Sequence, residues 1–147
     1  MNQAHLSRLL KYCVHFLPFF VQTALNCTKV TLVPGHVVYP WINDAKFVVG
    51  PGETGLTGNI YAGLHEFNDM GFLLHVLRDT DLFVDVGANV GSYTILACAV
   101  VGASGYAVEP VPATYARLVQ NVRLNELENR VTCLNMAMSC EEGEIRF

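Results

Sequence analysis

The feature that most constrains the fold is a short apolar run followed by two glycines, in residues 82–91. Residues 82–86 (LFVDV) have the near-continuous hydrophobic composition of a parallel strand that is covered on both faces. Gly87 permits a sharp turn and close approach of the backbone to a ligand, and Gly91 allows the next helix to pack tightly on the sheet. The run therefore predicts a strand, a glycine loop and a helix from about Ser92 to Val101.

The segments around this unit continue the alternation of helices and strands. The pattern predicts an amphipathic helix over 64–77, a buried strand over 106–108, a helix over 113–124 capped by Asn125, and a strand over 131–137. Residues 143–147 alternate like the start of a further strand. We therefore expect an α/β fold with a parallel, Rossmann-like sheet. Such sheets commonly have about five or six strands, so we expect this sheet to be incomplete and the chain to be truncated.

The first third of the chain has a different character. The apolar stretch at residues 12–21 is too short for a membrane-spanning helix, which needs about 20 residues, and we expect a short helix that packs on the domain. Residues 29–49 predict short strands, and the glycines of 50–58 predict a connecting loop. We divide the chain into an accessory region, 1–54, with a helix and short strands, and an α/β domain, 55–147.

The composition limits the classes of partner and the cellular compartment that we expect for this chain. The chain of 147 residues has nine Lys and Arg against thirteen Asp and Glu, and no basic stripe, so we expect no nucleic acid partner. Five cysteines without C-x-x-C spacing argue against a disulfide framework and favour a reducing, cytoplasmic location. We expect no metal site, and an open sheet edge makes a homo-oligomer possible.

Two carboxylates flank the glycine loop. Asp85 ends the first strand, where a negative charge suits a ligand with a cationic amino group by Coulomb attraction. Glu109 lies 22 residues beyond Gly87, at the end of the second strand, where a carboxylate can accept hydrogen bonds from ribose hydroxyls. S-adenosyl-L-methionine has the amino group, a sulfonium and the ribose. The alternatives are a capping role for Asp85 and a solvated strand end for Glu109.

A second cofactor class is compatible with a glycine loop. A nicotinamide-dependent oxidoreductase has the same architecture, but Asn89 occupies a position at which the dinucleotide fingerprint G-x-G-x-x-G has glycine. Asp85 also disfavours a pyrophosphate. We therefore prefer S-adenosylmethionine.

The domain resembles the FkbM family of class I S-adenosylmethionine-dependent methyltransferases. The likeness covers roughly residues 55–147, and its most specific part is the string from Asp81 to Thr94, followed by 108–110 and 136–139. The resemblance implies methyl transfer to a hydroxyl oxygen of a sugar or natural-product acceptor, a small molecule or a glycan. It also implies a set of cofactor-binding residues: Asp85, Gly87, Ala88, Asn89 and Gly91 at the methionine end, Glu109 at the ribose, and Met136 and Ala137 at the adenine.

Two residues that precede the first strand complete this candidate site. Tyr61 and Glu66 are candidates for lining the mouth of the cofactor site, against the alternatives of a core aromatic and a solvated helix carboxylate. We assign no catalytic base, because His65 and His75 lie on a helix expected to cover the sheet. An inactive, truncated fragment without catalysis therefore remains an alternative to an enzyme.

Overall fold

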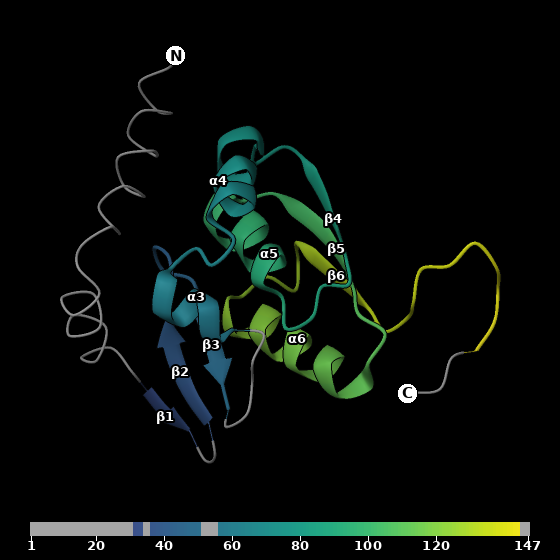
Figure 1. Ribbon diagram of the computed structural model, residues 1–147, viewed down its shortest axis with the longest axis horizontal. Helices are drawn as coiled ribbons and strands as arrows, with labels where there is room; N and C mark the ends of the chain where they lie inside the picture. Colours follow the sequence, from purple (N-terminus) through teal and green to yellow (C-terminus); the bar gives the residue numbers. More distant parts are fainter. Residues whose placement is uncertain (1–30, 34–35, 51–55, 145–147) are drawn as a thin grey trace.

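The computed structural model describes residues 31–33, 36–50 and 56–144 (Figure 1). The apolar stretch 12–21 and residues 145–147 of the expected last strand lie outside these ranges. In the described part of the chain, no helix has the length and apolar character needed to cross a membrane. The elements in chain order are β1 (Thr31–Val33), β2 (His36–Pro40), β3 (Lys46–Val49), α3 (Thr57–Ala62), α4 (Phe67–Val76), β4 (Leu82–Val86), α5 (Ser92–Ile95), η2 (Leu96–Val101), β5 (Ser104–Val108), α6 (Pro112–Leu124) and β6 (Val131–Leu134).

The predicted parallel sheet is present. Its order is β4-β5-β6, and Asp85 lies in register with Ala107 of β5, which lies in register with Cys133 of β6. The α/β fold of the class I type expected from the sequence is therefore confirmed. The third strand ends at Leu134, short of the predicted end at Ala137, and Gly143 and Glu144 are not in a strand.

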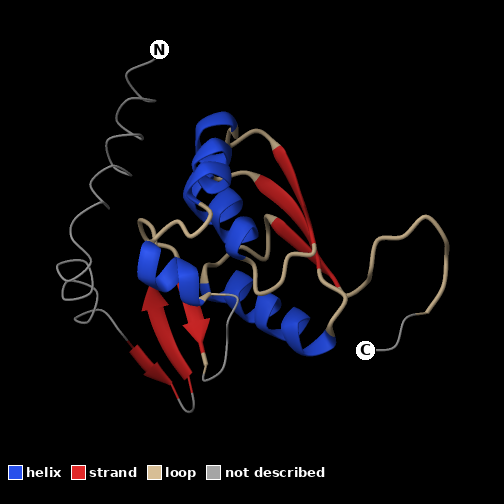
Figure 2. Cartoon of the chain, in the orientation of Figure 1, coloured by secondary structure: helices blue, strands red, loops and turns tan. Residues whose placement is uncertain are grey.

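Only one face of this sheet is covered by the described residues. Figure 2 shows α4, α5 and α6 on the same side of β4, β5 and β6. Along β4 the exposure alternates, so that Leu82, Val84 and Val86 are 61%, 53% and 58% exposed, whereas Phe83 and Asp85 are partly buried. The expectation that β4 is covered on both faces is therefore wrong for the part of the chain that the structure describes.

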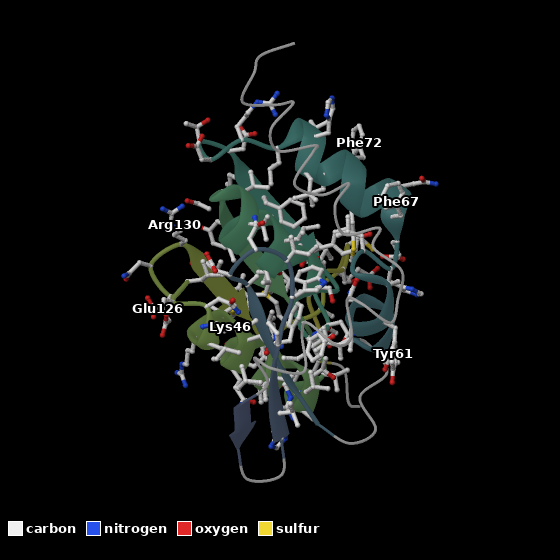
Figure 3. All side chains as sticks on the ribbon, turned by 90° about the vertical axis from the view of Figure 1, so that its left-hand side faces the viewer. Lys46, Tyr61, Phe67, Phe72, Glu126 and Arg130 are labelled. Carbon is white, nitrogen blue, oxygen red and sulfur yellow. The ribbon has the colours of Figure 1, made fainter. Side chains whose placement is uncertain are left out.

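The helix predicted over 64–77 is shorter than expected. Gly63 (φ +78°) follows the last residue of α3, and α4 begins at Phe67 after a four-residue turn. Its buried side consists of Met70, Leu73 and Leu74. Phe67 and Phe72 are 54% and 68% exposed and point outward (Figure 3). Met70, Leu73 and Leu74 share one face because each residue advances the helix by about 100°, which places Phe67 at the margin of that face and Phe72 opposite it.

The helix predicted from Ser92 to Val101 is also present but changes type midway. Its first four residues form α5, and the next six form η2, a π-helix that ends at Val101 and is followed by Gly102 with φ +95°. Leu96, Ala97 and Cys98 on η2 are almost fully buried. A π-helical segment has no hydrophobic period that distinguishes it from an ordinary buried helix, so the sequence did not indicate it.

The small antiparallel sheet β1-β2-β3 packs against α6 through two asparagines. The Asn125 side chain accepts a hydrogen bond from the backbone N–H of Lys46 and donates one to its carbonyl, both at 2.8 Å. Asn121, fully buried, accepts from the N–H of Val48 and donates to the carbonyl of Val90, also at 2.8 Å. Asn121 thus connects the accessory strands to the glycine loop. The division at residue 54 stays a prediction.

Candidate functional site

The glycine loop leaves open space at the carboxyl end of β4. Gly87 has φ +80° and no heavy atom within 4 Å of the position that a Cβ would take. Its N–H and that of Ala88 both donate to the carbonyl of Val108 at 2.9 Å, which fixes the loop against the end of β5. The predicted sharp turn is present, and a ligand can approach the backbone here.

Gly91 has a different environment from Gly87. It has φ +97°, and a Cβ built on it would lie 2.8 Å from Cδ1 of Leu118 on α6. The sequence predicted close packing of the helix on the sheet, whereas the close neighbour is the side chain of another helix. Gly91 therefore brings the start of α5 against α6.

Glu109, directly after β5, is hydrogen-bonded to the glycine loop. The side chain is 6% exposed, and its two oxygens accept hydrogen bonds from the backbone N–H groups of Asn89 and Val111, both at 2.9 Å. Asn89 has φ +52°, a conformation that few residues other than glycine adopt readily. A solvated strand end is therefore wrong for Glu109. Each carboxylate oxygen can accept a second hydrogen bond, so Glu109 can still receive a ligand hydroxyl.

Asp85 faces α5 from the covered side of β4. Its Oδ2 accepts a hydrogen bond from the hydroxyl of Thr94 at 2.5 Å. Burial raises the pKa of this carboxyl, and hydrogen bonds from the side chain and the backbone of Thr94 oppose that rise. A partly buried anion at the loop attracts a cationic group more strongly than an exposed one, because less water screens it.

Three successive hydroxyl side chains after the loop each bond a different segment. Ser92 accepts from the side chain of Asn59 on α3 at 3.1 Å, Tyr93 donates to Glu66 at 2.7 Å, and Thr94 donates to Asp85. No role was predicted for Ser92, Tyr93, Thr94 or Asn59. The run of three hydroxyl side chains directly after Gly91 is the signal that could have identified them.

The remaining predicted residues are spread around this centre. Glu66, at the start of α4, reaches the loop region through Tyr93. Tyr61 is 62% exposed on α3 and points away from the body of the molecule (Figure 3), so a core position is wrong for it. Met136 and Ala137 line an open pocket of about 1060 Å³ beside Glu109, together with Pro110. Their assignment to a cofactor, like that of the other site residues, stays a prediction.

The end of β6 is tied to the end of β5 beside that pocket. The amide of Asn135 donates to the carbonyls of Glu109 and Pro110, at 2.8 and 3.0 Å. The backbone that leads into Met136 is thereby held next to the buried carboxylate of Glu109. The loop, Glu109 and the pocket at Met136 thus lie along one edge of the sheet.

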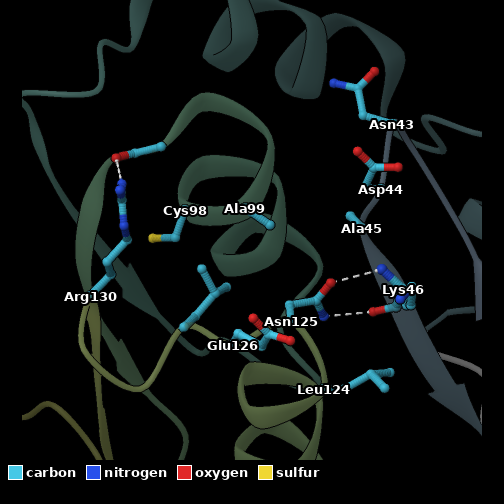
Figure 4. Close-up of a pocket in the computed structure, with 12 residues that line it drawn as sticks. Asn43, Asp44, Ala45, Lys46, Cys98, Ala99, Leu124, Asn125, Glu126 and Arg130 are labelled. Atoms are coloured by element: carbon cyan, nitrogen blue, oxygen red, sulfur yellow. Dashed lines mark hydrogen bonds between the residues drawn. The ribbon is translucent and has the colours of Figure 1, made fainter.

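A second pocket, of about 560 Å³, lies at the opposite ends of the strands (Figure 4). Gly102 and Arg130, which precede β5 and β6, line it, as does Asn125, whose side chain is bonded to Lys46. Arg130 donates to the carbonyl of Gly102. The polar side chains named here are thus bonded within the protein.

Thiols and metal ligands contribute little to the site. Among the described residues, no group of three His, Cys, Asp or Glu side chains is placed to hold a metal ion. Cys98, Cys133 and Cys140 are free thiols, and burial raises the pKa of Cys98 to about 11. A thiol with so high a pKa is protonated at neutral pH and is a weak nucleophile.

Comparisons with known proteins place this geometry in a family context. The family model described as the TRM5/TYW2 methyltransferase domain matches residues 59–144. No match was found among curated proteins.

Solved structures share the fold. A putative transferase from Pyrococcus horikoshii is 23% identical, with a TM-score of 0.57 over 71% of this chain and 37% of that one. P. horikoshii TYW2, solved with MeSAdo, is 22% identical, with a TM-score of 0.56 over 73% and 38%. M. jannaschii TYW2, solved with AdoMet, is 24% identical, with a TM-score of 0.54 over 70% and 43%. The chain thus spans about two fifths of the length of these proteins.

These matches correct three expectations from the sequence. The resemblance to the FkbM family is wrong, because the model that matches is that of a different methyltransferase family. The sugar or natural-product acceptor and the exclusion of nucleic acid are wrong as well, because TRM5/TYW2 methyltransferases act on tRNA. The match also favours a methyltransferase over the nicotinamide-dependent alternative.

Proposed function

The chain belongs to the TRM5/TYW2 methyltransferase domain family, and from this premise we propose that it takes part in methyl transfer from S-adenosylmethionine to tRNA. The cofactor expected from the sequence is confirmed by this membership. Because the chain spans about two fifths of its structural relatives, the activity and the tRNA substrate are proposals for this chain.

One observation carries the assignment of the cofactor site. The buried carboxylate of Glu109 bonds the loop at Asn89, next to the open space at Gly87. We propose that Glu109 accepts hydrogen bonds from the ribose hydroxyls and that Asp85 binds the amino group of the methionine part. The residues fit this cofactor, because two carboxylates suit a cation that also has hydroxyl donors.

The open pocket beside Glu109 completes the proposed site. Met136 and Ala137 line it and offer an apolar surface of the kind on which an adenine ring packs. Pro110 and Pro112 border the same pocket and stiffen its wall, because each has a fixed φ. We propose that Glu66, held by Tyr93, and Tyr61 lie at the outer mouth.

When bound, S-adenosylmethionine supplies a methyl carbon that its sulfonium has already activated. The residues described here would bind and orient it, and this positioning is the contribution to rate that a cofactor site of this kind makes. The residue that prepares the acceptor is not assigned. The sequence led us to expect a hydroxyl oxygen as the acceptor atom, and the identity of the acceptor atom in tRNA stays a prediction.

Calorimetry with S-adenosylhomocysteine tests the site. We expect Asp85→Asn to weaken binding about 10- to 100-fold, since a hydrogen bond to a charged group contributes about 1.5–3 kcal/mol. Gly87→Val should weaken it further by filling the open space at φ +80°. The matched control is Gly71→Val on α4, where a side chain also meets no atom within 4 Å but φ is not positive. Equal affinity of wild type and Asp85→Asn would contradict the assigned site.

A labelled-methyl assay tests the reaction. The full chain is incubated with tRNA and S-adenosylmethionine labelled in the methyl group, and the tRNA is digested to nucleosides. Label in one modified nucleoside is the expected result, and its identity gives the acceptor atom. Cofactor binding without any labelled tRNA would instead support the alternative of a cofactor-binding chain without catalysis.

A further inference from the structure

Thr94 is the side chain in closest polar contact with Asp85. It lies on α5, is 1% exposed, and its hydroxyl donates to Asp85 Oδ2 at 2.5 Å. Asp85 Oδ2 is thus engaged by the protein, and the geometry of that bond fixes the direction in which the second oxygen points. A buried threonine has few alternative rotamers, because its β-branch restricts χ1. The hydroxyl is therefore held in place before any ligand binds.

We propose that Thr94 is a positioning residue that keeps the Asp85 carboxylate ionised and oriented toward the amino group of the cofactor. This inference rests on the proposed function, because it takes Asp85 as the group that binds the methionine part. Thr94 itself need not touch the cofactor. Its hydroxyl stabilises the anion that does.

The hydrogen bond from Thr94 affects the charge state of Asp85. Burial raises the pKa of Asp85, so the site tends to take up a proton and lose the charge that attracts the cofactor. The hydrogen bonds from Thr94 act in the opposite direction. Without the hydroxyl, only the backbone hydrogen bond of Thr94 still lowers the pKa of Asp85 against the effect of burial.

Other titratable groups near Asp85 do not replace this effect. Tyr93 on α5 and Cys98 on η2 both have raised pKa values, chiefly through burial and with a contribution from Asp85, and are neutral at pH 7. Cys133 lies across the sheet in the register of Asp85, and burial raises its pKa as well. Glu66, at the start of α4, accepts a hydrogen bond from Tyr93.

The test uses Thr94→Val, which has nearly the same shape without the hydroxyl, and Thr94→Ser, which retains it. Affinity for S-adenosylhomocysteine is measured by calorimetry between pH 5 and 9. For Thr94→Val we expect the fall in affinity on acidification to begin about one pH unit higher than in wild type, with binding up to about tenfold weaker at the acidic end of the profile and unchanged at the alkaline end. Thr94→Ser should follow the wild-type profile. In the Asp85→Asn background, Thr94→Val should have no further effect.

A merely structural threonine gives a different result. It would lower the affinity by the same factor at every pH and add its effect to that of Asp85→Asn, and either outcome would overturn the inference. The NMR titration of the Asp85 carboxyl carbon in the unliganded protein gives an independent readout. We expect a higher pKa in Thr94→Val than in Thr94→Ser, and equal values would overturn the inference.

Failure of the proposed function would have its own signature. If the wild-type chain bound no S-adenosylhomocysteine, the proposed cofactor site would fail, and this inference with it. If wild type bound and Asp85→Asn lost affinity while Thr94→Val matched wild type at every pH, only the role of Thr94 would be overturned.

Discussion

Gly91→Ala should destabilise the fold by about 2–5 kcal/mol, and the structure separates two causes. A residue with a Cβ at φ +97° has a conformational cost of about 1–2 kcal/mol. The new Cβ would also lie 2.8 Å from Cδ1 of Leu118, well inside the usual carbon–carbon contact of about 3.5–4.0 Å. Leu118 is fully buried, so it has little room to move, and overpacking of this kind costs about 1–3 kcal/mol.

The matched control is Gly87→Ala, because Gly87 also has positive φ but no atom within 4 Å of the new Cβ. Urea unfolding followed by circular dichroism should show a loss of about 1–2 kcal/mol for Gly87→Ala. The difference between the two variants gives the energy of the contact with Leu118. In Gly91→Ala with Leu118→Ala, the combined loss should be smaller than the sum of the single losses, since the truncated side chain makes room. Strictly additive losses, or equal losses for both glycines, would refute the reasoning.

Three further predictions concern stability. Gly71→Ala should stabilise the protein by up to about 1 kcal/mol in thermal unfolding, because Gly71 lies inside α4 with no atom within 4 Å of the new Cβ; a loss of stability would contradict this packing. Asn121→Ala should cost about 2–4 kcal/mol, because it leaves the buried backbone groups of Val48 and Val90 without partners; a loss under 1 kcal/mol would argue against these bonds. Asp85→Asn should be more stable than wild type at pH 7, because burial raises the pKa of Asp85 and disfavours its anion. That advantage should vanish below about pH 4, where the carboxyl is protonated in both the folded and the unfolded states.

The sequence predicted the loop and its flanking strands because each depends on local chemistry. An apolar run followed by Gly87 specifies a strand and a turn that needs positive φ, and both are observed, although the described residues cover only one face of β4. The predicted cap Asn125 is likewise the residue that directly follows the last residue of α6. Glu109 was identified from its position at the end of a strand, although its hydrogen bonds to the loop were not foreseen.

The polar contacts around the site could not be predicted in this way. Ser92 and Asn59 are 33 residues apart, and Tyr93 and Glu66 are 27 apart. No periodicity of the sequence links such pairs, because they meet only when the turn between α3 and α4 brings both helices beside α5. That turn is also what displaced the start of α4 to Phe67.

The error about the acceptor has a physical origin as well. The residues in the glycine loop are assigned to the cofactor rather than to the acceptor, and one type of cofactor site can serve enzymes that modify unrelated acceptors. Net charge was no better guide, because RNA binding requires a local basic surface rather than a basic chain. The described residues have five Lys and Arg against twelve Asp and Glu. We therefore assign no tRNA contact to them.

The two faces of β4 differ in exposure in the part of the chain that the structure describes. Leu82, Val84 and Val86 lie on the exposed face, while Asp85 lies on the covered face beside α5. In a half-exposed strand that is placed by hydrophobic burial alone, the carboxylate would face solvent. A shift of one residue would bury the three apolar side chains but would turn Asp85 away from Thr94. The observed orientation therefore keeps Asp85 beside Thr94, on the same face as α5, and places the three apolar side chains on the face that the described residues leave uncovered.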